Sequence, residues 1–189
     1  MTAAGTVRSF VALEMPETVR DAIRREQRAL KAELPRARWT RPEGQHLTLK
    51  FLGETPVSRI HELSTSIGGA LRGRPAVKVA LSGSGFFPNP RRPRVAWVGG
   101  EARGGAEVAA AVETAAVGCG FEPERRPWAL HLTQARLDRP WPRPAVERFL
   151  DWGRTIELPP FRCAEVVLFE SDLRPGGAVY TALERFPLT

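Results

Sequence analysis

The sequence holds few of the residues that build disulfide scaffolds and membrane anchors. Its two cysteines, Cys119 and Cys163, stand alone, without a CxxC motif or a disulfide framework. No apolar run approaches the roughly 18 residues that cross a bilayer, and the opening "MTAAGTVRSFVALEM" has no basic segment followed by a long apolar one. These absences exclude a disulfide-rich fold. They predict a protein without a signal peptide or membrane partner, in a reducing, cytoplasmic setting.

Negative charge is also in short supply. The chain has 28 Lys and Arg residues against 21 Asp and Glu residues, a net charge of +7 and a pI near 10.6. This surplus favours polyanions as partners, nucleic acid first, although a bias towards Arg, Pro, Ala and Gly would produce it as well. A hydrophobic fraction of 42% over 189 residues is enough for a packed core, so we expect one domain or two small lobes.

Strand and helix patterns alternate irregularly along the chain. Period-two alternation and short apolar runs predict strands at 7–15, 46–53, 76–83, 95–100, 128–137, 161–171 and 178–186. Helical spacing of apolar residues predicts helices at 17–33, 57–71, 106–117 and 143–153. Two strand pairs look like hairpins, 76–83 with 95–100 and 161–171 with 178–186, the second across a turn at "DLRPGG". The pattern predicts an α+β fold with antiparallel sheets, not a doubly wound parallel sheet.

The chain has three histidines, and the first lies in the strand "HLTLKFLG". Strict alternation places His46, Thr48 and Lys50 on one face of this strand and the apolar residues, Phe51 included, on the other. The polar face is either a solvated surface or the floor of a site.

A second copy of this motif decides between those readings. "HLTQARL" begins at His131, 85 residues after His46, and each motif follows an extended stretch with a tryptophan and precedes a helix. This indicates a weak internal duplication. In each motif the His and Thr side chains point the same way because they are two residues apart. If the strands face one another across a pseudo-twofold axis, two imidazoles converge with the hydroxyls of Thr48 and Thr133.

Two facing imidazoles suit acid–base catalysis. With an unperturbed pKa near 6.5, one can accept a proton while the other donates one. Two hydroxyls and the Lys50 ammonium can hold phosphate oxygens, so the site needs no metal or other cofactor to cleave or form a phosphodiester through a 2′-hydroxyl. A metal centre at the two histidines is the alternative, but no Asp, Glu or Cys lies beside either at ligand spacing. His61 has no Thr partner and is expected on the surface.

These motifs resemble those of the two-histidine phosphoesterase superfamily, and more closely the RNA 2′,3′-cyclic phosphodiesterases, also called 2′-5′ RNA ligases. The family pattern is a pair of His-x-Thr/Ser-x motifs, here "HLTL" and "HLTQ". The stretches "RSFVALEMPETVRDAI", "PRVAWVG" and "SDLRPGGAVYTALERFPL" also resemble family segments, so the likeness covers nearly the whole chain. Gln134 departs from the pattern, which usually has an apolar residue there. It lies on the face opposite His131 and is expected to affect packing.

The resemblance implies a fold and a reaction. The fold is two pseudo-symmetric lobes, each an antiparallel sheet with outer helices, with the active-site cleft between them, so that residues 1–189 form one two-lobed domain. The reaction is metal-independent hydrolysis of a terminal RNA 2′,3′-cyclic phosphate to a 2′-phosphate, with 2′-5′ ligation as its reverse. The resemblance makes His46 the proton donor and His131 the acceptor, an order that the residues themselves leave open. Thr48 and Thr133 would hold the non-bridging oxygens.

Further substrate contacts are expected outside the paired motifs. Arg136 stands where the family often has Arg, but strict alternation points it away from His131, so a phosphate contact would require a bulge. The segment "GFFPNPRRPR" has three prolines and is predicted to be irregular. In it, Phe86 or Phe87 could stack on a base, while Arg91, Arg92 and Arg94 could meet phosphates. Alternatively, the Phe pair anchors the loop to the core. Nothing in the sequence demands a dimer, so we expect a monomer.

The sequence is also compatible with two other functions. The enzyme could act on another 2′-linked or cyclic nucleotide, such as a cyclic phosphate of ADP-ribose or a 2′-5′ oligonucleotide. The chain could also be a non-catalytic RNA- or nucleotide-binding module, although both histidines and both threonines are present.

Overall fold

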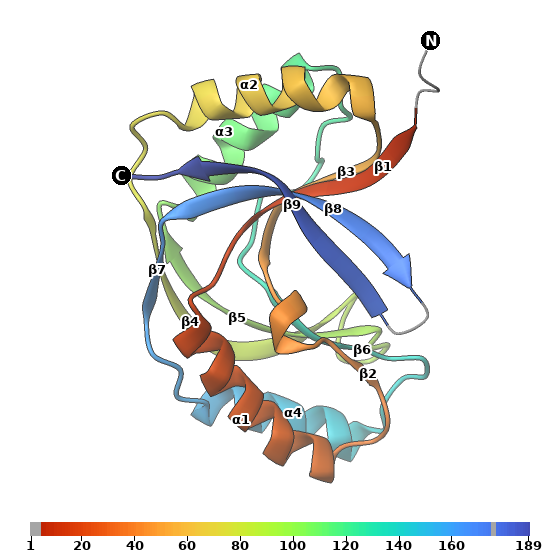
Figure 1. The fold of residues 1–189 in the computed structure, drawn as a ribbon. Coiled ribbons are helices and arrows are strands. Elements are labelled where there is room, and N and C mark those ends of the chain that lie inside the picture. Colours follow the sequence, from red (N-terminus) through yellow and green to blue (C-terminus); the bar gives the residue numbers. More distant parts are fainter. Residues whose placement is uncertain (1–4, 175–176) are drawn as a thin grey trace.

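Two antiparallel sheets, each covered on its outer face by a pair of helices, make up the fold (Figure 1). The computed structural model describes residues 5–174 and 177–189. The upper sheet has the strand order β3 (Leu47–Pro56), β1 (Thr6–Leu13), β8 (Glu165–Arg174) and β9 (Gly177–Pro187). The lower sheet has the order β2 (Arg38–Trp39), β6 (Leu132–Arg136), β5 (Val95–Arg103), β4 (Val77–Phe87) and β7 (Phe161–Cys163). This arrangement confirms the predicted α+β class.

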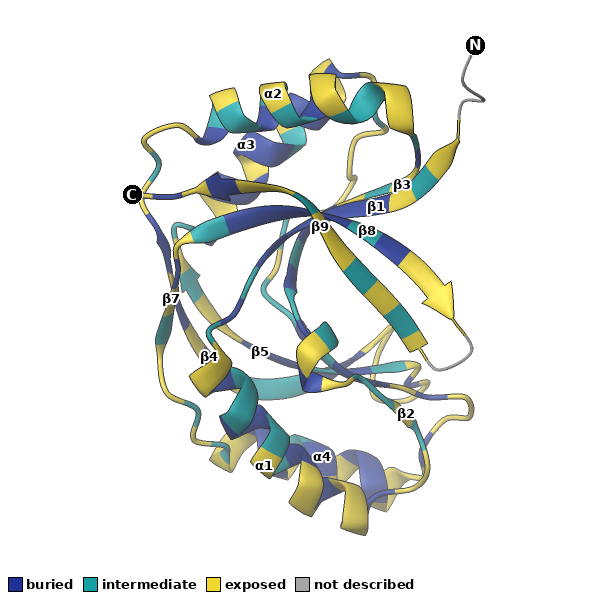
Figure 2. Ribbon diagram, in the orientation of Figure 1, coloured by how far each residue is buried: buried dark blue, intermediate teal, exposed yellow. Residues whose placement is uncertain are grey.

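The helices divide between the two sheets. α2 (Ile60–Leu71) and α3 (Gly105–Gly118) lie above the upper sheet, and α1 (Glu17–Glu33) and α4 (Arg143–Thr155) lie below the lower one (Figure 1). The short 3-10 turns are η1 (Pro42–Gly44) and η2 (Val57–Arg59). In α1 the buried residues recur every three or four positions, so one stripe faces the sheet; the other helices also turn buried residues inward (Figure 2). No helix in the described ranges is long and apolar enough to span a membrane.

Several predicted boundaries change in the structure. The strand expected at 128–137 covers only Leu132–Arg136. β4 runs on to Phe87, so the first residues of the segment predicted to be irregular are strand. It does so by way of Gly83, whose φ of 68° favours glycine, at a register shift against β5. Both predicted hairpins pair antiparallel. Part of the expected "DLRPGG" turn, residues 175–176, lies outside the described residues.

A second, smaller cluster of buried apolar residues lies apart from the main core. It consists of Phe10, Ala12, Val167 and Phe169, with Tyr180 packed against it. Their neighbours in β1 and β8 belong to the main core that contacts α2 and α3. The small cluster therefore marks the inner face of the upper sheet, which turns away from its helices and towards the lower sheet (Figure 1).

Candidate active site

A β-bulge in β3 sets which side chains of the first motif face inward. Ala12 of β1 pairs with Thr48, and the residue before it, Val11, pairs with Lys50. Leu49 therefore has no partner in β1 and is an extra residue. Thr48 therefore shares the inner face with Ala12. Beyond the bulge the faces exchange, and Phe51, opposite Phe10, also turns inward.

The second motif contains the same bulge at the equivalent position. Trp97 of β5 pairs with Thr133, and Ala96 pairs with Ala135, so Gln134 is the extra residue. Thr133 and Arg136, three residues apart, consequently lie on one face of β6, turned away from α1 and α4. The bulge that a substrate contact by Arg136 would require is present.

The bulge contradicts the predicted placement of Lys50. The Lys50 side chain is 3% exposed and points to the helix side of the sheet. Its Nζ donates to Glu113 Oε2 of α3 at 2.8 Å and to the carbonyl of Glu122 at 2.8 Å. Phe51, expected on the buried face, is 62% exposed on the inner side. Strict alternation fails at both residues because the extra Leu49 reverses their faces.

His46 lies immediately before β3 in an aromatic setting. Its ring centroid is 4.4 Å from that of Phe10, 5.0 Å from Tyr180 and 6.3 Å from Phe169. Burial lowers the pKa of His46 to about 4, although the hydrogen bond to the Gly44 carbonyl opposes this, and the charges of His131 and Arg136 lower it further. His46 is therefore neutral at pH 7 in the free protein.

His131 lies immediately before β6 and is partly exposed. Its Nδ1 is 3.0 Å from the Ala129 carbonyl, as His46 Nδ1 is 3.0 Å from the Gly44 carbonyl. A carbonyl oxygen only accepts, so Nδ1 carries the hydrogen in both rings and Nε2 is left to exchange protons. Each histidine thus has the same backbone partner, two residues before it, and the same tautomer.

The two threonines complete the constellation. Thr48 and Thr133 are both partly exposed, and neither hydroxyl has a hydrogen-bond partner among the described residues. The strand of the first motif is tied to the loop before the second by Trp128, whose Nε1 donates to the Thr48 carbonyl at 2.7 Å. Two unused hydroxyls beside two imidazoles give the site donors for an oxyanion and groups for proton transfer.

The predicted RNA loop divides between core and site. Phe86 is 4% exposed and packs on Phe149, so it anchors the loop. Phe87 is 39% exposed and lies edge-on to His131, with ring centroids 5.3 Å apart. Arg91 and Arg92 are exposed in the loop beyond, where their backbone amides donate to the Asn89 side chain.

Among residues 5–174 and 177–189, no group of three or more His, Cys, Asp or Glu side chains is arranged to hold a metal ion. Gln134, the last residue of the second motif, is buried as expected: its Oε1 accepts from Gln27 Nε2 at 3.0 Å in the core.

Comparison with known proteins identifies the family. The family model described as LigT-like phosphoesterase matches residues 13–97. An RNA 2′,3′-cyclic phosphodiesterase of Methanothermobacter thermautotrophicus is 33% identical over 183 residues, which cover 96% of this chain and 99% of that protein. The chain belongs to the LigT-like phosphoesterase family. The resemblance inferred from the two motifs is thereby confirmed.

Other LigT-like phosphoesterases agree in sequence and fold. A Thermus thermophilus RNA 2′,3′-cyclic phosphodiesterase is 33% identical over 191 residues, 96% of this chain and 90% of that protein. A solved structure of a Thermus thermophilus protein superposes with a TM-score of 0.77 at 28% identity, over 96% of this chain and 97% of the other. The apo form of E. coli LigT gives a TM-score of 0.74 at 25% identity, over 98% and 99%.

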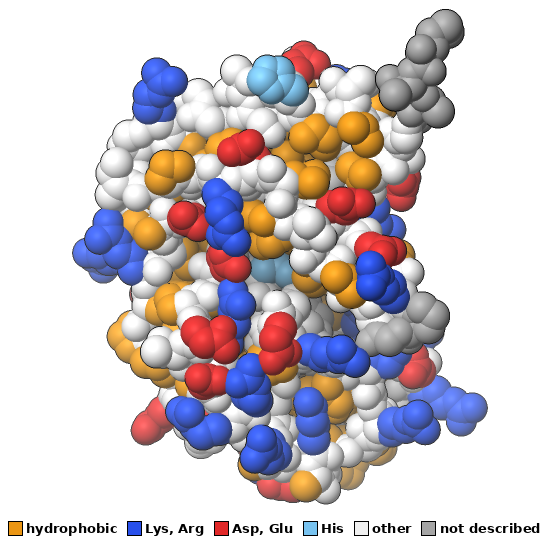
Figure 3. Space-filling view, viewed as in Figure 1, with side chains coloured by type: hydrophobic (Ala, Val, Ile, Leu, Met, Phe, Trp, Pro, Cys, Tyr) orange, Lys and Arg blue, Asp and Glu red, His pale blue; other side chains and the backbone are white. Residues whose placement is uncertain are grey.

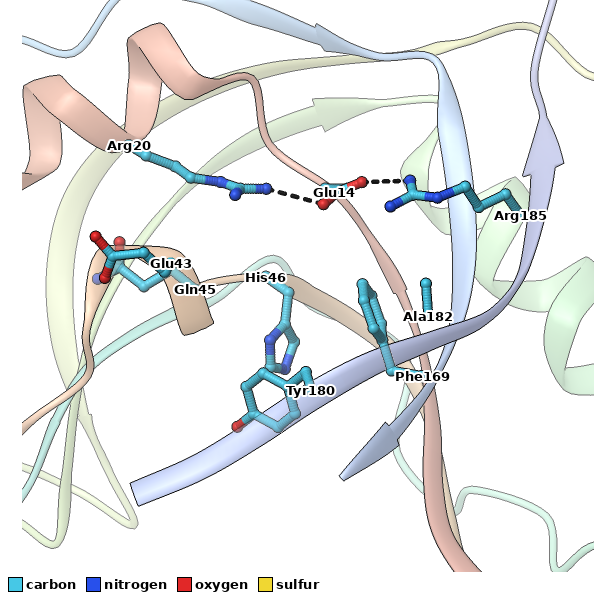
Figure 4. A pocket seen from close by; sticks show the side chains of 9 residues that line it. All are labelled: Glu14, Arg20, Glu43, Gln45, His46, Phe169, Tyr180, Ala182 and Arg185. Carbon is cyan, nitrogen blue, oxygen red and sulfur yellow. Dashed lines mark hydrogen bonds and ion pairs between the residues drawn. The ribbon is translucent and has the colours of Figure 1, made fainter. Parts of the chain in front are cut away.

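The sequence pattern missed part of the surroundings of His46 in this LigT-like phosphoesterase. It assigns no role to Tyr180, yet the ring of Tyr180 lies beside that of His46, and burial raises the pKa of its hydroxyl against the charges of Arg136 and Arg8 (Figure 4). It also misses Phe10 and Phe169. Alternation along β1 and β8 divides their residues between the two faces of the sheet. It does not indicate which face carries the site.

A pocket opens on one side of His46. Its lining residues are Glu14, Arg20, Glu43, Gln45, His46, Phe169, Tyr180, Ala182 and Arg185 (Figure 4). Burial alone would raise the pKa of Glu14, but hydrogen bonds from Arg185 and Arg20 lower it overall. Glu14 thus stays ionised between two arginines and neutralises this part of the pocket wall (Figure 4).

Proposed function

We propose that this LigT-like phosphoesterase hydrolyses the 2′,3′-cyclic phosphate at the end of an RNA chain to a 2′-phosphate. The observation that carries the proposal is the matched pair of His46 and His131, each with Nδ1 on a backbone carbonyl and a threonine hydroxyl beside it on the inner face. Relatives named RNA 2′,3′-cyclic phosphodiesterase support the substrate class. E. coli LigT complexes with 3′-AMP and with ATP support a nucleotide ligand.

The proposed chemistry uses the two imidazoles as acid and base. Water attacks the phosphorus in line with O3′, and the bond from phosphorus to O3′ breaks. Nε2 of His131 accepts the proton from water, and Nε2 of His46 donates a proton to O3′. The hydroxyls of Thr48 and Thr133, with the guanidinium of Arg136, stabilise the charge on the non-bridging oxygens.

The donor role of His46 requires the substrate. Because the pKa of His46 is about 4 in the free protein, its imidazolium form is scarce at pH 7. A cyclic phosphate carries a negative charge, and an opposite charge within a few ångström raises a histidine pKa. We therefore propose that His46 gains its proton together with the bound phosphate.

The same geometry supports ligation. If the 5′-hydroxyl of a second RNA takes the place of water, a 2′-phosphodiester forms through the same proton transfers. His131 again accepts the proton of the attacking hydroxyl, and His46 again protonates O3′. The two histidines exchange roles only in the reverse of ligation, when the 3′-hydroxyl attacks the 2′-5′ linkage and the 5′-hydroxyl leaves. The two reactions share the site, so we propose that ligation and hydrolysis are lost together when either histidine is replaced.

We propose four further RNA contacts at the rim of the site. Phe87, beside His131, and the exposed, inward-facing Phe51 offer ring faces for base stacking. Arg91 and Arg92, exposed beyond Phe87, offer charges to the phosphate backbone. One copy of the chain supplies both motifs, so we propose that the monomer is the active unit.

Product analysis tests the proposed function. An RNA ending in a 2′,3′-cyclic phosphate is incubated with the protein in EDTA, and the product is resolved as 2′- or 3′-phosphate. We expect a 2′-phosphate, and we expect His46→Ala and His131→Ala each to lower turnover at least about 100-fold, since general acid–base catalysis contributes about 10²–10⁴-fold. A 3′-phosphate product, near-normal hydrolysis by His131→Ala, or binding without turnover would overturn it.

A further inference from the structure

Three cations stand side by side across three strands of the lower sheet. Lys78 of β4 lies directly opposite Arg103 of β5 and directly opposite Arg162 of β7. Directly opposite residues of antiparallel strands project from the same face of a sheet. The neighbours of Lys78 in β4, Val77 and Val79, are buried at 0% and 1% exposure, so the three cations project from the other, exposed face of the sheet. We call Arg103, Lys78 and Arg162 the cation row.

The cation row is not neutralised by carboxylates. All three side chains are exposed, and none forms an ion pair within the part of the chain that the structure describes. Glu101 is the one acidic residue that lines the same shallow groove, and it pairs in register with Ala80, two residues along β4 from Lys78. The groove therefore keeps a net positive charge.

The structure of the groove adds a second feature. Beside the cations the groove is lined by the exposed Ala80 and Pro160 and by the partly buried Phe161. Apolar surface next to positive charge is the combination with which proteins hold single-stranded nucleic acid, where cations meet phosphates and apolar side chains meet bases.

Protection of the sheet edge does not account for the row. Like charges directly opposite one another destabilise a sheet. A cation on an edge strand can be explained by the need to prevent edge-to-edge pairing, and β7 is such an edge (Figure 1). Lys78 and Arg103, however, lie on β4 and β5, which are interior strands of the sheet. A polyanion held across the row would relieve the repulsion.

We propose that the cation row binds the phosphate backbone of the RNA substrate at a distance from its reacting end. This rests on the proposed function for the identity of the polyanion. Trp97, the partner of Thr133, and Arg103 are six residues apart in β5, or about 20 Å at 3.3 Å per residue. A stacked strand that rises about 3.4 Å per nucleotide must be at least about six nucleotides long to reach the row. Shorter substrates do not reach it.

The test compares two charge-matched double variants. Lys78→Gln/Arg162→Gln removes two cations of the row, and Arg25→Gln/Arg28→Gln removes two exposed cations of α1. Fluorescence anisotropy measures binding of a 16-nucleotide RNA with an unreactive 3′-hydroxyl as a function of salt. For the row variant we expect the slope of log K against log salt to fall by about 1.4, because each lost contact to single strands removes about 0.7. The α1 variant should keep the slope of the parent.

Two further measurements separate this proposal from the proposed function. Turnover of a 2′,3′-cyclic mononucleotide, which cannot reach the row, should be unchanged in the row variant, and binding of a three-nucleotide RNA should be unchanged too. The binding assay needs no turnover, so it reports on the row even if the protein fails to hydrolyse cyclic phosphates. An unchanged salt slope for the row variant, or an equal loss in the α1 variant, would overturn the proposal.

Discussion

At the level of single residues, burial lowers the pKa of His46, whereas its proposed role as proton donor requires a higher pKa. The aromatic surroundings that fix the ring also lower its pKa to about 4, and the charges of His131 and Arg136 act in the same direction. A proton donor at neutral pH needs the opposite shift. The site resolves this conflict only when an anion binds beside His46, which makes the protonation of His46 a measure of substrate binding.

We therefore expect the pKa of His46 to rise when a nucleoside 2′-phosphate binds. The imidazole resonances are followed by NMR between about pH 3 and 8, in the parent and in the single variants His61→Ala and His131→Ala, which together assign the three histidine signals. The free protein should titrate at His46 near pH 4, and the complex at least one unit higher. A pKa that stays near 4 in the complex would mean that His46 is the base and His131 the donor.

Arg136 is the second residue whose role the geometry makes testable. It faces inward because of the bulge at Gln134, and its charge reaches both His46 and Tyr180. A hydrogen bond to a charged group contributes about 1.5–3 kcal/mol, so Arg136→Ala should lower kcat/KM for the cyclic phosphate about 10- to 100-fold. Arg139→Ala, an exposed cation three residues on, is the control and should leave kcat/KM within about twofold. Equal losses in both variants would contradict a specific role.

At the level of elements, the paired bulges separate what the sequence predicts from what it does not. Alternation correctly places Thr48 and Thr133 on the faces of their histidines, because both lie before the bulge. It fails at Lys50, Phe51 and Arg136, because all three follow the extra residue of a β-bulge, and the sequence pattern does not predict either bulge. A bulge depends on the register against β1 or β5, and register is a property of the folded sheet.

The buried position of Lys50 leads to a prediction about stability. Lys50→Met removes the bonds from Nζ to Glu113 and to the Glu122 carbonyl and leaves both acceptors without that donor. We expect the free energy of unfolding, measured with urea, to fall by about 1–3 kcal/mol. The KM of the folded variant for RNA should stay close to that of the parent, because Lys50 faces α3. Lys78→Met, at an exposed site, is the stability control. A raised KM with unchanged stability would restore the substrate contact expected from the sequence.

Other elements follow the sequence more closely. The helix α3 and the strand β9 lie close to their predicted bounds, because apolar spacing determines them. The strand predicted at 161–171 is instead two strands, β7 (Phe161–Cys163) in the lower sheet and β8 (Glu165–Arg174) in the upper sheet, because the chain passes from one sheet to the other between them. The strand around His131 is shorter than predicted, since residues 128–131 have no partner in the sheet, and Trp128 instead reaches across to the Thr48 carbonyl. Periodicity alone does not distinguish an extended segment from a paired strand.

For the molecule as a whole, the two sheets share one core. The main cluster of buried apolar residues includes Val112 of α3 and Phe149 of α4, at 0% exposure each, on opposite sides of the molecule (Figure 1). The distance between His46 and His131 therefore depends on a continuous packed interior.

The surface of the molecule is rich in positive charge. Lys and Arg side chains cover much of the lower half of one face, with acidic groups among them (Figure 3).

A shared core predicts that both halves unfold together. We expect calorimetry to give one transition whose calorimetric and van't Hoff enthalpies agree. Phe149→Ala, in the lower half, should destabilise the protein by about 3–5 kcal/mol, and Val112→Ala, in the upper half, by about 1–3 kcal/mol. Four of the five tryptophans belong to the lower half: Trp39 in β2, Trp97 in β5, Trp152 in α4 and Trp141, which packs on Phe149. Tryptophan fluorescence should nevertheless follow the transition that Val112→Ala shifts. If Val112→Ala instead splits the transition in two, with tryptophan fluorescence unmoved, the lobes are separate domains, and a rigid spacing of the two histidines would need another origin.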